Sequence, residues 1–181
     1  MAIVAVLGAA FSLREQEPNP CNVRLAQEVL RACDELRARG HMPVVAVQWE
    51  IDAALQSLGR TKTYDNVRSV FDDGAFPYMV IGQYDDGRYL GTREVLKEAL
   101  PFFGDMGATH FVGVAQPYIH QPYLYWLARK SFRLIWIRTR RIGFDPDSTQ
   151  QWCRSWWQLT KYTVKILITG SHGYDGRQAK A

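Results

Sequence analysis

Short apolar runs alternate with amphipathic segments along most of the chain. The apolar runs cover residues 3–7, 43–47, 78–82, 111–115 and 133–137, and each has the length and composition of a buried strand. The segments between them place apolar residues at helical spacing. Repeated alternation of this kind is typical of βα units, which build a parallel sheet. The pattern therefore predicts an α/β domain with a mainly parallel sheet of about five strands.

The first helix is predicted over residues 22–39. Leu25, Val29, Cys33 and Leu36 fall on one helical stripe, and Gly40 supplies a stop. Further helices are expected over residues 52–58 and 123–130, with a short one around 65–71. These segments supply the layers that cover the two faces of the sheet.

Two later helices carry more specific expectations. One starts with Thr92 as its N-cap and ends where Pro101 and Gly104 bracket it. The last begins near residues 147–149 and carries Trp152 and Trp156 at helical spacing. We expect this last helix to pack across the sheet, with Trp152, Trp156 and Trp157 in the core.

The chain is expected to form a single α/β domain over residues 1–170, followed by a flexible C-terminal tail over 171–181. The apolar opening stretch lacks a basic region, and charge and turn residues follow it at once, so a buried strand is favoured over a signal peptide. No window offers the roughly 18 apolar residues of a membrane span. Three cysteines without a CxxC pair favour reduced thiols and a cytoplasmic protein.

Composition narrows the choice of partners. Hydrophobic residues make up 47% and charged residues 22% of the chain, which are ordinary values for a globular domain. The net charge of +4 suits anionic partners, but without basic residues gathered on one face it does not indicate nucleic-acid binding. The aromatic content of 13%, with six tryptophans, is the unusual feature.

In open parallel sheets, ligands bind beyond the carboxyl ends of the strands, and this rule selects the candidate residues. The predicted catalytic residues are His120 and Glu50. The predicted ligand-binding residues are Gly8, Ala9, Gln48, Gln83, Asp85, Thr92, Gln116, Tyr118 and Arg138. No HExxH, CxxC or GxSxG sequence is present, so neither a metal site nor a nucleophile elbow is expected.

Each candidate has a structural alternative. The Gly8 turn matches neither GxGxxG nor a Walker A sequence, and small residues there can serve packing alone. His120 can act as acid, base or ligand donor, or it can cap its helix. Asp85 stands in an Asp-Asp-Gly turn, whereas Glu50 is better placed to bind a sugar hydroxyl. Arg138, with Arg140 and Arg141, can bind phosphate or be solvated surface residues.

Several short stretches are similar to a known family. They are Val6-Leu7-Gly8, Arg24-Leu25, Thr92-Arg93-Glu94 and the run from Val114 to His120, together with a last helix that ends at Gly170. In these the chain resembles the YdcF/SanA/ElyC-like domain of unknown function (DUF218). The resemblance implies a three-layer α/β/α, Rossmann-like fold with a polar pocket for a nucleotide-like or phosphorylated ligand.

Three functional hypotheses follow. The first is a small-molecule-binding protein whose ligand is anionic or nucleotide-like. The second is a transferase or hydrolase acting on a phosphorylated or glycosyl substrate, with His120 as acid/base and Glu50 or Asp85 assisting. The third is an interaction protein, such as a homo-oligomer, with a partner surface of aromatic residues that include Tyr123, Tyr125, Trp126 and Trp157.

Overall fold

Five parallel strands form the central sheet of the protein, in a computed structural model that describes residues 1–14, 18–64, 67–69, 78–82 and 90–169. The strand order is β5-β2-β1-β6-β7. The bounds are β1 (Ile3–Gly8), β2 (Met42–Gln48), β5 (Tyr78–Ile81), β6 (His110–Val114) and β7 (Arg133–Leu134). Gly8 lies opposite both Val47 and Val114, so the three central strands end at the same edge.

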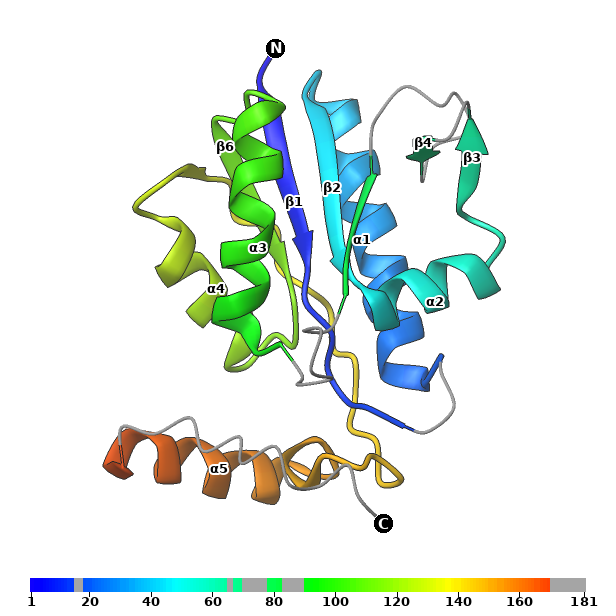
Figure 1. The fold of residues 1–181 in the computed structure, drawn as a ribbon. Coiled ribbons are helices and arrows are strands. Elements are labelled where there is room, and N and C mark those ends of the chain that lie inside the picture. The colour runs from blue at the N-terminus through cyan, green and yellow to red at the C-terminus, as the bar shows by residue number, and fades with distance from the viewer. Residues whose placement is uncertain (15–17, 65–66, 70–77, 83–89, 170–181) are drawn as a thin grey trace.

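Helices cover both faces of this sheet (Figure 1). The helices α1 (Pro20–Ala38) and α2 (Trp49–Ser57) pack on one face, and α3 (Thr92–Asp105) and α4 (His120–Ala128) pack on the other. This is the predicted three-layer α/β/α, Rossmann-like fold, and the strand order reverses between β1 and β6. None of the helices in the described part of the chain is long and apolar enough to cross a membrane.

Alternate side chains of the central strands enter two separate cores. Val4 and Val6 of β1 lie in the core under α1 and α2, whereas Ala5 and Leu7 lie in the core under α3 and α4. Because both faces are buried, the strands have continuous apolar sequences rather than alternating ones. This explains why the apolar runs located the strands correctly.

The predicted helices around residues 65–71 and from Thr92 differ from the structure. The helix expected around residues 65–71 is wrong for residues 67–69, which form the strand β4 (Val67–Ser69) of a hairpin with β3 (Lys62–Tyr64). The helix α3 has Gly91 as its N-cap and Thr92 as its first residue, and it runs through Pro101 to Asp105. Pro101 is exposed, so the carbonyl that loses its hydrogen bond there can be solvated.

The fifth strand is shorter than predicted. Only Arg133 and Leu134 pair with β6, although the Ile135 amide still donates to Phe111 O at 2.9 Å. Beyond this point the Tyr125 hydroxyl donates to Ile135 O at 2.9 Å and accepts from the Ile137 amide at 3.2 Å. A side chain of α4 therefore takes over the backbone pairing, and the chain leaves the ladder.

The last helix, α5 (Trp156–Thr169), does not pack across the sheet as predicted. It follows a 3-10 turn (Gln151–Cys153) and lies beyond the carboxyl edge of the strands (Figure 1). Trp156 and Trp157 are 54% and 65% exposed, so the prediction that they belong to the core is wrong. The predicted tail, residues 171–181, lies outside the described residues.

The loop after β1 holds the segment that leads to α5. The Asp145 carboxylate, whose side chain is 1% exposed, accepts from Ser12 Oγ at 2.6 Å and from Arg14 Nε at 2.8 Å. The Arg14 guanidinium is the main cause that lowers the pKa of Asp145 below its ordinary value. The Thr149 amide also donates to Leu13 O at 2.8 Å. The first and last parts of the described chain are thus joined at the carboxyl edge.

Candidate functional site

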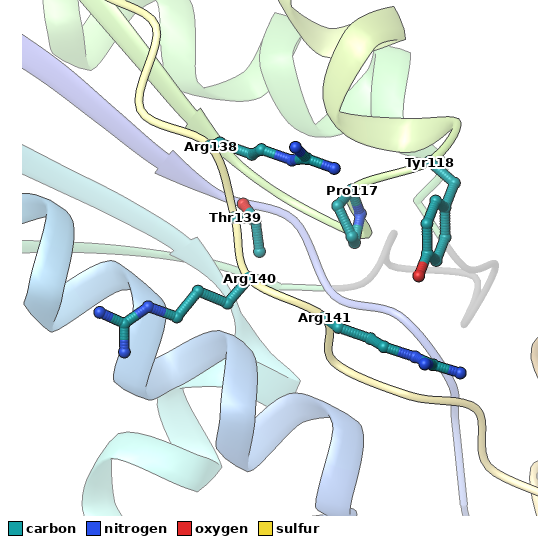
Figure 2. A pocket seen from close by; sticks show the side chains of 6 residues that line it. All are labelled: Pro117, Tyr118, Arg138, Thr139, Arg140 and Arg141. Carbon is teal, nitrogen blue, oxygen red and sulfur yellow. The ribbon is translucent and has the colours of Figure 1, made fainter.

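A pocket of about 300 Å³ opens at the carboxyl edge of the sheet. One wall is the loop that follows β6, and the other is the segment that follows β7 (Figure 2). The lining residues are Pro117, Tyr118, Arg138, Thr139, Arg140 and Arg141. A pocket of this volume is at the small end of the range for small-molecule sites.

The wall after β7 is held in place by one amide side chain of α4. Gln121 is fully buried, and its Nε2 donates to Gly113 O at 2.7 Å and to Ile137 O at 2.8 Å. Its Oε1 accepts from the Thr139 amide at 3.0 Å. Gln121 therefore replaces the missing strand ladder and brings Arg138 and Thr139 to the mouth of the pocket.

The arginines of this wall point in two directions (Figure 2). The Arg140 side chain extends toward α1, and its Nε lies 3.9 Å from Glu28 Oε1. The backbone amide of Arg140 donates to Glu28 Oε2 at 2.9 Å. Arg138 and Arg141 extend instead toward the side where Pro117 and Tyr118 lie. Within the described part of the chain, neither forms an ion pair. Two uncompensated positive charges therefore face the pocket.

The loop after β6 contributes a shaped wall. Gln116 is fully buried, and its Oε1 accepts from the amides of Tyr118 at 3.1 Å and Ile119 at 3.0 Å. These bonds fix the turn that presents Tyr118, which is 40% exposed. The Tyr118 ring meets the ring of Trp156 in an edge contact with centroids 4.9 Å apart. The start of α5 thus supports this wall of the pocket.

Two buried polar atoms near the pocket have no protein partner. Thr139 is 2% exposed, and its Oγ1 makes no hydrogen bond to the described residues. The same is true of Nε2 of Gln116. A buried donor without a partner costs about 1–3 kcal/mol, so groups of this kind are usually satisfied by water or a ligand.

His120 begins α4 beside this wall. Its ring makes an edge contact with Phe11, with centroids 5.6 Å apart, and its Nδ1 is buried without a hydrogen-bond partner. Burial lowers the pKa of His120 to about 4. The imidazole is therefore neutral at physiological pH and can donate or accept one hydrogen bond at each nitrogen, depending on its tautomer.

The residues predicted after β1 and β2 have structural partners instead. An added Cβ on Gly8 would lie 2.9 Å from Val47 Cγ1, so close packing alone accounts for this glycine. The Ala9 amide donates to Val114 O at 2.9 Å, and the Ala10 amide donates to Gln48 Oε1 at 2.7 Å. These backbone donors are used within the protein, unlike those of a phosphate-binding turn.

The remaining predicted residues lie apart from the pocket lining. Gln48 is buried and its Nε2 donates to Leu90 O at 3.1 Å, which ties the end of β2 to the start of α3. Glu50 is fully buried in the first turn of α2, and Thr92 is half-buried at the start of α3. Gln83 and Asp85 lie outside the described residues.

Of the predicted residues, the structure thus brings Tyr118 and Arg138 together in the pocket, with Gln116 and His120 next to its wall. Sequence reasoning missed Thr139, since a threonine between two arginines carries no signal of its own. It noticed Arg141 but had no reason to prefer it over Arg140. The direction of each side chain depends on where the backbone leaves the sheet.

Comparisons with protein-family models, with curated proteins and with solved structures found no match to this chain. The described residues include no cluster of three or more His, Cys, Asp or Glu side chains that could hold a metal ion.

Proposed function

We propose that the protein binds a small anionic molecule, phosphorylated or nucleotide-like, in the pocket between the loop after β6 and the segment after β7. The observation that carries this proposal is the pair of guanidinium groups, Arg138 and Arg141, which line the pocket and have no carboxylate partner among the described residues. Guanidinium groups bind phosphate oxygens through paired, charge-assisted hydrogen bonds.

Two further features support a ligand with a polar and a planar part. Thr139 lines the same pocket, and its buried hydroxyl makes no hydrogen bond to the described residues. The exposed Tyr118 ring on the opposite wall offers a face on which a base or a sugar ring can pack. The position at the carboxyl edge of a Rossmann-like sheet agrees with the general location of ligand sites in such sheets.

A thermal-shift and calorimetry panel tests the proposal with matched ligands. The panel pairs each phosphorylated compound with its neutral counterpart: adenosine monophosphate with adenosine, and glucose 6-phosphate with glucose. The phosphorylated members should raise the Tm, and the neutral members should not. The affinity should fall as salt is raised, because the charges at the pocket mouth are exposed.

Variants then locate the site. Arg138→Gln and Arg141→Gln should each weaken binding by roughly 10- to 100-fold, in the range of a charge-assisted hydrogen bond. Arg133→Gln changes an exposed arginine on β7 outside the pocket and is the control. Equal losses in all three variants would place the anion elsewhere. The absence of a Tm shift with every phosphorylated compound would overturn the proposal.

A further inference from the structure

The helix α5 stands outside the three layers of the fold (Figure 1). Its inner side is attached through the buried Leu159 and through Tyr162, whose ring stacks on Trp152 with centroids 4.6 Å apart. Near its start, Trp156 contacts the ring of Tyr118. One side of the helix is therefore fastened to the body, while the other side faces outward.

The outward side of α5 carries exposed apolar residues beside lysines. Trp157 is 65% exposed and Val164 is 48% exposed, and a spacing of seven residues places them about two turns apart on the same side of the helix. Trp156, which is 54% exposed, borders this stripe. An exposed apolar stripe of this kind marks a surface that binds another phase or another molecule.

Positive charges accompany the stripe. Lys161 and Lys165 are exposed on α5, and Lys161 Nζ lies 5.2 Å from the centroid of the Trp157 ring. The sequence contains no Asp or Glu between residues 148 and 174. The helix α5 thus carries positive and no negative side chains, and its charge is complementary to a negatively charged surface.

From this arrangement we infer that α5 lies on the surface of an anionic lipid bilayer, with Trp157 and Val164 in the interface and Lys161 at the headgroups. Tryptophan rings favour the headgroup level of a bilayer, and lysines beside an apolar helix face bind anionic lipids. A protein partner would need its own acidic groove around this helix, whereas a bilayer supplies both the apolar phase and the negative charge. The inference does not depend on the ligand of the pocket.

Co-sedimentation with vesicles tests the inference on the full-length protein. Binding to vesicles of phosphatidylcholine and phosphatidylglycerol should exceed binding to phosphatidylcholine alone and should fall with salt. Lys161→Gln should lower the affinity roughly fivefold, as expected for a lysine near a charged membrane. Trp157→Ser and Val164→Ser should also weaken binding, with at least a tenfold loss for Trp157. The matched control is Trp126→Ser, which changes a tryptophan on α4 that is 52% exposed.

Two readouts separate the outcomes. Far-UV circular dichroism and the Tm confirm that each variant is folded before its vesicle binding is compared. Equal binding to neutral and anionic vesicles, no binding to either, or an equal loss in Trp126→Ser would each overturn the inference. Light scattering without vesicles tests whether α5 binds a second copy of the chain instead. If Trp157→Ser converts an oligomer to a monomer there, α5 is a contact between copies and the inference is wrong.

Discussion

Replacing His120 with glutamine should remove a specific part of the pH dependence of stability. The pKa of this imidazole is lowered by burial from its ordinary value of 6.5 to about 4 in the folded protein. The unfolded chain therefore binds a proton between these values when the folded protein does not. The contribution of the neutral His120 to the free energy of unfolding is therefore complete above pH 6.5. It is lost progressively as the pH falls and changes no further below about pH 4.

The size of this contribution follows from the two pKa values. At about pH 5 the unfolded imidazole is largely protonated and the folded one largely neutral. Linkage then makes the folded state less stable than at about pH 7.5 by at most roughly 2 kcal/mol. Because the residue His120 as a whole is half-buried rather than fully buried, solvent relaxation can only reduce this figure. The His120→Gln variant should not show this fall in stability between the two pH values, since glutamine does not titrate.

Urea unfolding of both proteins at about pH 7.5 and about pH 5 measures the difference. Carboxylates contribute little in this window, since their unfolded pKa values lie near 4. Ring proton NMR of the histidines, compared between the two proteins, assigns the resonance of His120 and gives its pKa directly. A His120 pKa near 6.5, or the same loss of stability on acidification in the variant, would refute the reasoning.

Two substitutions at other positions test the packing and the polar contacts. Gly8→Ala should destabilise the protein by about 1–3 kcal/mol through overpacking. Gly82→Ala, whose added Cβ meets none of the described residues within 4 Å, should be nearly neutral in the same urea titration. Asp145→Asn should lower the free energy of unfolding by roughly 2 kcal/mol, because it weakens the hydrogen bonds from Ser12 and Arg14. Asp147→Asn is the control: its side chain is 76% exposed, and the free energy of unfolding should change by less than about 0.5 kcal/mol. Similar values for the two aspartates would show that burial of Asp145 adds nothing.

The elements that the sequence predicted well are those whose apolar pattern matches the pattern of burial in the structure. In β1 every residue from Val4 to Gly8 is buried, so the apolar run and the strand coincide. The stripe of α1 was equally informative, because Leu25, Val29, Cys33 and Leu36 all enter one core. The stop at Gly40 is confirmed by its positive φ of 74°. Local sequence and tertiary packing agree in these elements.

The predictions are wrong where a sequence pattern is compatible with more than one tertiary arrangement. An apolar helical stripe does not say what covers it, so α5 was expected against the sheet, although Trp156 and Trp157 are exposed. Tyr125 was expected at a partner surface, but it is 3% exposed and its hydroxyl bonds the chain after β7. The local sequence around a tyrosine does not show whether its side chain is buried or lies at the surface.

The candidate site could be predicted only as a region. The rule for parallel sheets selects the carboxyl edge, and Tyr118 and Arg138 line a pocket there. The rule does not say which of the loops at this edge form the pocket, because that depends on contacts between segments that are distant in the sequence. The bonds of Gln121 to Gly113, Ile137 and Thr139 decide where the arginine segment runs.

The bonds between the loop after β1 and the segment before α5 have a consequence for the order of folding. Ser12 and Asp145 are 133 residues apart in the sequence, and Thr149 and Leu13 are 136 apart. Closing so long a loop is entropically costly until the strands and helices between the two segments have already formed. During synthesis, moreover, the loop after β1 must wait for nearly the whole chain before its partner appears. We expect this closure to form last and to open first, so that the amides it protects exchange with solvent sooner than those of β1 or β2.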